Sequence, residues 1–234
     1  MKRFWDKAAA TAQPDGFGVA LDGKPVRLPG GAALLVPNLA LAEAIAAEWA
    51  AAGGGAKGGD MAMHDVPLTR LAGTAQERIA PNPVNQVLGL AQYGQTDLLC
   101  YRAADRKLAA EQTLRWQPLL DWAALELDAA LMVTTGLMPV PQPEPALAAL
   151  RRALSRCSVL ELAALGVLVP ALGSLVLGLA VRHARLDAAE AHALSVLDET
   201  FQEEFWGTDP EAERRRHRGR TEAELAARLF ALSR

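Results

Sequence analysis

The stretch "GGGAKGGD", residues 53–60, decides how the chain divides, because it is the one segment whose composition is typical of a linker. Before it, "FGVALDGKPVRL", residues 17–28, alternates around Asp22-Gly23, which predicts a β-hairpin. After it, the apolar spacing becomes mainly helical. We therefore expect β structure before this stretch and a mainly helical chain after it.

Several shorter segments carry local signals. "GAALLVP", residues 31–37, predicts a short strand, and Asn38 can cap the helix that follows. "TDLLCYRA" (96–103) and "LMVTT" (131–135) are strand-like, and Asp187 with Glu190 three residues later predicts the start of an acidic helix. Further helices are expected over residues 39–52, 67–79, 84–93 and 104–127.

The acidic helix has an unusual outer face. In "LDETFQEEFWG", residues 197–207, helical spacing gathers Leu194, Leu197, Phe201 and Phe205 into one apolar stripe that should face the core. The opposite face carries Glu199, Gln202, Glu203 and Trp206. Like charges four residues apart, such as Glu199 and Glu203, destabilise a helix by about 0.2–0.5 kcal/mol. A Trp side chain usually stabilises a protein by being buried, so Trp206 is unusual on an outer face. Either this face is simply solvated, or another protein completes it.

The surrounding charges are uneven, although the whole chain carries a formal net charge of only −3. Residues 187–213 contain nine carboxylates and no Lys or Arg, whereas "RRRHRGR", residues 214–220, contains five Arg. Some of these arginines can pair backwards within a helix, as Arg215 can with Glu211. The run lacks interleaved aromatic residues, so we expect no nucleic-acid partner.

Residues 162–181 contain no charge over twenty positions, which is long enough to span a bilayer. Pro170 interrupts this segment and neither end carries a Trp or Tyr belt. We therefore expect two short buried helices or one kinked helix, and no stable membrane insertion. A helical membrane-associated protein remains an alternative. Cys100 and Cys157 show no pair spacing and the N-terminus lacks an apolar signal core, which together favour a reducing, cytoplasmic location.

Catalytic signatures are scarce in this sequence. It contains no GxSxG, phosphate loop or HExxH motif, and its four His are scattered. Glu199 and Glu203 could act as a carboxylate pair, which leaves an enzyme as a second alternative. We expect no catalytic residue, no metal and no cofactor, because no ligand or nucleophile constellation is present.

Eight blocks, in order from end to end, resemble one family. They are "LDGKPVRLP", "ALAEAIAAEW", "MHDVPLTRLAGTA", "YGQTDLLCYRA", "WQPLLDW", "TTGLMPVPQP", "LGSLVLGLAV" and "LDETFQEEFWG". Together they resemble the assembly chaperones that bind the free α subunit of the F-type ATP synthase catalytic head. The sequence departs from the family mainly at "AAGGGAKGGDMAMHD", because members of the family more often have polar residues after the Glu-Trp pair.

The resemblance implies an α+β fold with a small β-rich N-terminal domain, residues 1–60, and a larger, mainly α-helical C-terminal domain, residues 61–234. It also implies a function without catalysis. Such chaperones hold newly made α subunits and prevent their aggregation until β subunits replace the chaperone. Eukaryotic relatives act in the mitochondrial matrix, whereas the Ala-rich composition here indicates a bacterial protein. We expect a monomer when free. A chaperone must later release its client, and a rigid helix that carries charges and one or two aromatic residues is suited to such reversible binding. The expected partner-binding site is therefore the outer face with Glu199, Gln202, Glu203 and Trp206.

Overall fold

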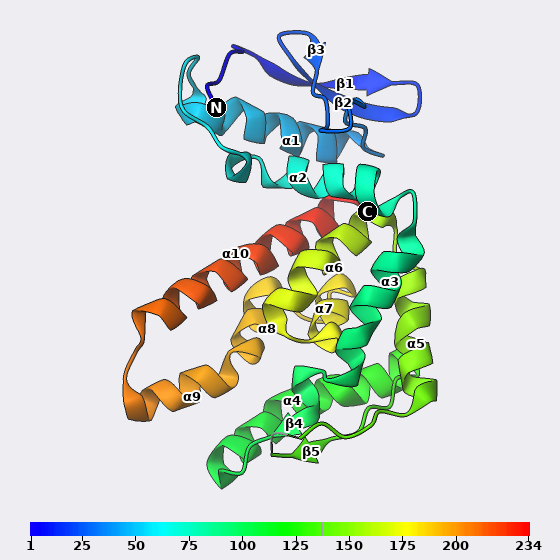
Figure 1. Ribbon diagram of the computed structural model, residues 1–234, viewed down its shortest axis with the longest axis vertical. Coiled ribbons are helices and arrows are strands. Elements are labelled where there is room, and N and C mark those ends of the chain that lie inside the picture. The colour runs from blue at the N-terminus through cyan, green and yellow to red at the C-terminus, as the bar shows by residue number, and fades with distance from the viewer. Residues whose placement is uncertain (137) are drawn as a thin grey trace. The chain divides into compact units, whose positions relative to one another are not determined.

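The computed structural model describes residues 1–136 and 138–234, and it leaves out the side chain of Phe205. Phe205, which the sequence assigns to the apolar stripe, therefore lies outside the described side chains. The chain forms two compact units: Met1–Pro83, Val159–Ala164 and Arg228–Arg234 make unit 1, and Val84–Ser158 with Leu165–Ala227 makes unit 2. A small N-terminal sheet and a mostly helical remainder confirm the α+β class (Figure 1).

Unit 1 contains a three-stranded antiparallel sheet in the order β1-β2-β3. Its strands are β1 (Ala8–Gln13), β2 (Gly16–Leu21) and β3 (Lys24–Pro25). Asp22 and Gly23 connect β2 to β3 with φ of 47° and 79°, the left-handed pair that a tight hairpin turn requires. The hairpin expected here is confirmed. The strand expected over residues 31–37 is reduced to two isolated bridges, Phe17 with Val36 and Arg27 with Ala33.

Helix α1 (Leu39–Ala51) packs against β1 and β2. The Asn38 side chain accepts a hydrogen bond from the backbone N–H of Leu41 at 2.9 Å, which confirms the predicted cap. The indole N–H of Trp49 donates to the Thr69 hydroxyl at 2.9 Å, and the Trp49 ring lies edge-to-face against Trp5, so Trp49 belongs to the core.

The predicted boundary at residue 60 lies inside unit 1, which extends to Pro83. The Glu48 carboxylate accepts hydrogen bonds from the backbone N–H groups of Leu68 and Thr69, and this fixes the start of α2 (Pro67–Thr74) against α1. The glycine-rich stretch 53–60 forms a turn within the unit, where the backbone N–H of Arg3 donates to the Gly59 carbonyl. The composition of this stretch is typical of a linker, but tertiary packing makes it part of unit 1.

Helices make up most of the remaining chain. They are α3 (Pro83–Ala91), α4 (Arg106–Leu127), α5 (Glu144–Ser155), α6 (Val159–Leu172), α7 (Leu175–Arg182), α8 (Ala188–Ser195), α9 (Leu197–Trp206) and α10 (Pro210–Leu232). A π-helical turn spans Ala75–Ile79, and 3₁₀ turns span Ala52–Gly55, Met63–Asp65, Gln92–Gln95 and Leu98–Cys100. The two strand-like segments of unit 2 contribute only β4 (Tyr101–Arg102) and β5 (Thr134–Thr135), which pair in parallel.

The uncharged segment 162–181 lies on two helices, α6 and α7. Pro170 sits inside α6, and the break comes later, at Gly173 with φ of 64° and at Ser174, which caps α7. Within the described parts of the chain, no helix is both long and apolar enough to cross a membrane.

Asp97 belongs to unit 2 and is fully buried. Its carboxylate accepts hydrogen bonds from the Ser174 hydroxyl at 2.7 Å, from the Val176 N–H at 3.0 Å and from the Leu99 N–H at 3.1 Å. These bonds join the β4 region to the N-terminus of α7. Asp97 and Ser174 thus form a structural hydrogen-bond network.

Candidate functional site

The acidic segment consists of two helices. Asp187 and Glu190 form a reciprocal capping box at the start of α8, as the sequence predicts. The single helix expected to continue to residue 206 is interrupted at Val196, whose φ of −107° and ψ of 15° are not helical. The interruption gives α9 its own direction, so its faces are set by its neighbours in unit 2 and not by α8.

Helix α4 holds the inner side of α9. The Gln112 side chain donates to the Asp198 carboxylate at 2.7 Å, and the buried Trp116 indole donates to the Leu194 carbonyl at 3.1 Å. Leu197 is 8% exposed and belongs to the core, whereas Phe201 is only half-buried. The apolar stripe therefore faces inward at its N-terminal end and approaches the surface further along α9.

The outer carboxylates of α9 are neutralised by the arginine run of α10. Arg216 Nη1 lies 2.6 Å from Glu203 Oε1 and 3.7 Å from Glu199 Oε2, and Arg215 Nη2 donates to Glu199 Oε2 at 3.1 Å. The Arg216 and Glu203 side chains are 14% and 20% exposed, so this pair is largely sheltered from water. Arg216 Nη1 and Glu203 Oε1 are thus partners at ion-pair distance, although they lack an aligned hydrogen bond.

These contacts correct two expectations. Arg215 pairs with Glu199 on the preceding helix, and among the ion pairs of the described residues none joins it to Glu211. Glu199 and Glu203 are also not bare charges that only another protein can compensate. The chain reverses after Gly207, whose φ is 78°, and this reversal brings two distant segments of opposite charge together.

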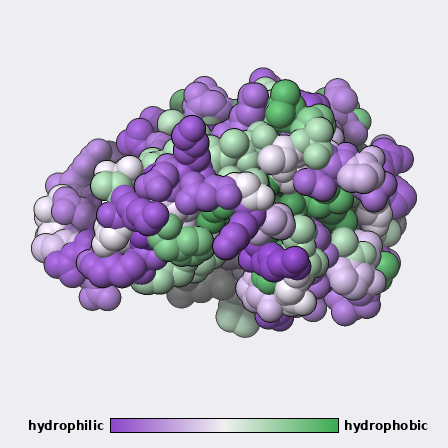
Figure 2. Space-filling view, turned by 90° about the horizontal axis from the view of Figure 1, so that it is seen from above, coloured by the Kyte–Doolittle hydropathy of each residue, from purple (hydrophilic) through white to green (hydrophobic). Residues whose placement is uncertain are grey.

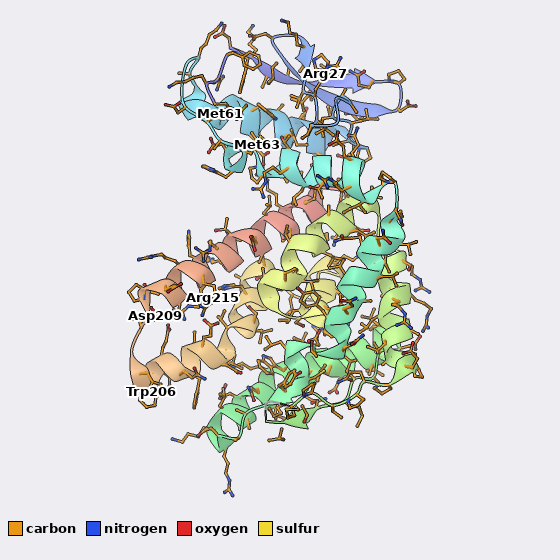
Figure 3. The ribbon with its side chains drawn as sticks, viewed as in Figure 1. Arg27, Met61, Met63, Trp206, Asp209 and Arg215 are labelled. Carbon is orange, nitrogen blue, oxygen red and sulfur yellow. The ribbon has the colours of Figure 1, made fainter. Side chains whose placement is uncertain are left out.

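Trp206 lies at the C-terminal end of α9 and is 87% exposed, the highest value among the exposed large apolar side chains of the described residues (Figure 3). Gln202 is also exposed one turn before it. The structure therefore brings the four predicted residues onto one helix in two different states: Glu199 and Glu203 are ion-paired, and Gln202 and Trp206 face solvent. A large aromatic side chain held at the end of a braced helix is suited to a protein contact.

Two cavities flank α9, and neither could be predicted from the sequence. One, of about 430 Å³, is lined by Arg115, His192 and Arg220 among others, and a second, of about 620 Å³, is lined by Lys107 and Phe201 among others. Burial lowers the pKa of His192, and the nearby charges of Arg220 and Arg216 lower this pKa further. Because these side chains come from different helices, no local spacing could have identified them.

The arginine pairing also bears on catalysis. A carboxylate that acts as a general acid or base needs an oxygen directed at a substrate proton. One oxygen of each carboxylate, Glu199 Oε2 and Glu203 Oε1, lies at ion-pair distance from an arginine instead. In the described part of the chain, no group of three or more His, Cys, Asp or Glu side chains could hold a metal ion.

This chain is similar to a known family over its first half and to solved structures over nearly its whole length. The family model described as ATP12 chaperone protein matches residues 2–124. The crystal structure of Atp12 from Paracoccus denitrificans is 43% identical with a TM-score of 0.92, and the match covers 100% of this chain and 98% of that one. The structure of a point mutant of P. denitrificans Atp12p is 42% identical to this chain with a TM-score of 0.91, and the match covers 100% of this chain and 98% of that one. The Atu1473 protein from Agrobacterium tumefaciens is 36% identical with a TM-score of 0.89, over 99% of this chain and 85% of that one.

Proposed function

This chain belongs to the ATP12 chaperone family, and from that premise we propose that it binds the free α subunit of the F-type ATP synthase. Binding prevents aggregation of the α subunit until β subunits replace the chaperone during assembly of the catalytic head. The observation that carries this proposal is the 43% identity to Atp12 of Paracoccus denitrificans over the whole chain. The chaperone acts by binding alone, as a monomer in the bacterial cytoplasm, without catalysis or cofactor.

The proposed contact surface is the α9 face at Gln202, Trp206 and the exposed edges of Glu199 and Glu203. Trp206 supplies the anchor, because a rigid aromatic side chain buries a large area with little loss of conformational entropy. The ion pairs to Arg215 and Arg216 brace the helix that presents it. One aromatic anchor within a charged surface also allows release, which a broad apolar patch would hinder.

Co-purification tests the proposed partner. A tagged chain expressed in its native cell is captured without detergent, and the bound protein is identified by mass. The proposal predicts the ATP synthase α subunit. Recovery of the chain with no α subunit, under conditions where free α subunit is present, contradicts it.

Trp206→Ala tests the proposed surface in the same experiment. We expect the dissociation constant for the α subunit to rise about tenfold or more, as is usual for an aromatic anchor, with no change in thermal midpoint. Leu125→Ala is the matched control, because Leu125 is 81% exposed on α4. Equal affinity of both variants and the wild type would remove Trp206 from the site.

A further inference from the structure

Unit 1 contains a cavity of about 470 Å³ whose lining differs from that of the α9 site. Buried side chains of Val26, Leu28 and Trp49 form part of its apolar wall, and Met63, 47% exposed, lies at its edge. On the face shown in Figure 2, hydrophobic residues are interspersed with hydrophilic ones. Its size lies within the range of about 300–1,000 Å³ that ligand sites occupy.

Three exposed arginines, Arg27, Arg70 and Arg78, line the same cavity (Arg27 and Met63 are labelled in Figure 3). Arg70 and Arg78 come from α2 and the π-helical turn that continues it, and Arg27 follows β3. Arg27 Nη1 donates to the Gly31 carbonyl at 2.7 Å. The three arginines thus come from three segments of unit 1, and all of them line one recess.

The charges of these arginines are not compensated within the described residues. The ion pairs found there involve other cations, and none joins Arg27, Arg70 or Arg78 to a carboxylate. Glu77 lines the cavity too, but its Oε1 accepts a hydrogen bond from the Gly30 N–H at 2.8 Å and holds the neighbouring loop. Three positive charges and one negative charge therefore surround the recess, in a chain whose formal net charge is −3.

We propose that this cavity is a second docking site, and that it receives an acidic segment of the protein client with an apolar side chain flanked by carboxylates. This inference rests on the proposed function, because it requires a protein client. The apolar wall accepts the apolar side chain, and the arginines pair with the carboxylates, for which the planar guanidinium group is well suited. A thioether such as that of Met63 adapts to differently shaped side chains.

A peptide segment fits these features better than an inorganic anion does. A phosphate ion would leave the wall of Val26, Leu28 and Trp49 in contact with water, and it would not need a recess of this volume. The arginines lie on different segments around the recess. They can therefore pair with several carboxylates along one polypeptide. The occupant is therefore an acidic polypeptide.

Charge reversal provides the first test. In Arg70→Glu with Arg78→Glu, two guanidinium groups at the cavity become carboxylates. We expect the dissociation constant for purified α subunit to rise about tenfold or more, and its salt dependence to weaken. The matched control is Lys7→Glu with Lys24→Glu, which makes the same charge change at two exposed lysines of unit 1 outside the cavity. The control should bind as the wild type does, and all variants should keep the wild-type thermal midpoint.

Photo-crosslinking provides the second test and identifies the occupant. A photoreactive amino acid replaces Thr74, an exposed residue of the cavity lining, or Lys24 as the control position. Position 74 should capture one segment of the α subunit that contains both acidic and apolar residues, and position 24 should capture none.

The outcomes separate this inference from the proposed function. If the wild type binds the α subunit, but charge reversal leaves affinity unchanged and position 74 captures nothing, the second site is overturned and the proposed function stands. A captured segment without acidic residues, or displacement of the segment by millimolar inorganic phosphate alone, overturns the acidic-peptide assignment. If the wild type does not bind the α subunit at all, the proposed function itself fails.

Discussion

Two buried carboxylates show how single residues connect distant segments of this fold. Burial raises the pKa of Asp97 and of Glu48, while hydrogen bonds from backbone N–H groups oppose that rise. Both residues accept such bonds from the first turn of a helix, α7 for Asp97 and α2 for Glu48. Partially charged N–H groups at a helix N-terminus stabilise a carboxylate, and this offsets part of the desolvation that each residue suffers.

The two cysteines should differ strongly in reactivity. Burial, together with the adjacent charge of Asp97, raises the pKa of Cys100 to about 12, whereas Cys157 is only half-buried. Because the thiolate is the reactive form, we expect a thiol reagent at pH 8 to modify Cys157 in the native protein and Cys100 only after denaturation. Cys157→Ser should then show no rapid reaction. Equal modification rates for the two native thiols would contradict this arrangement.

His192 should make stability depend on pH. Its pKa is lowered by burial and by Arg220 and Arg216, while Glu199 acts in the opposite direction. Below the usual value of 6.5 the unfolded chain therefore binds more protons than the folded one, so the free energy of unfolding falls as pH drops through the lowered pKa. His192→Gln should reduce this slope in urea titrations at several pH values. The control is His217→Gln, at an exposed position of α10, and an identical slope in all three proteins would refute the prediction.

At the scale of elements, local signals predict the starts of helices and the tight turn. Asn38, Asp187 with Glu190, and Asp22-Gly23 act through atoms a few residues away, so the sequence is enough to identify them. The sequence does not predict the interruption at Val196 or the pairing of α9 with α10. Glu199 and its partner Arg215 are 16 residues apart, and only the chain reversal after α9 brings them together.

The pairing of α9 with α10 predicts an effect of charge reversal on stability. Glu203→Lys would place a cation beside the largely sheltered Arg216, and we expect it to lower the free energy of unfolding by about 1–3 kcal/mol, between values for exposed and buried pairs. Gln202→Lys, at an exposed neighbour, should stay within about 0.5 kcal/mol. Adding Arg216→Glu to Glu203→Lys should restore part of the loss in urea denaturation. If the double variant is no more stable than Glu203→Lys, the two side chains do not interact.

For the whole molecule, the fold class and the family could be predicted from the sequence, and the limits of the units could not. The glycine-rich stretch has the composition of a linker, yet α2 beyond it packs on α1, and unit 1 also includes Val159–Ala164 and Arg228–Arg234. Such contacts join segments far apart in the sequence, where periodicity carries no information. The predicted contact residues lie together on α9, but their ion pairs appear only in the three-dimensional structure.

We propose that this chain protects free α subunits from aggregation until β subunits replace it. The most direct measurement is light scattering from purified α subunit after dilution from denaturant, with and without an equimolar amount of this protein. We predict that scattering is suppressed and that later addition of β subunits releases the chaperone, as seen by size-exclusion chromatography. Scattering equal to that of α subunit with the same amount of serum albumin would contradict the claim.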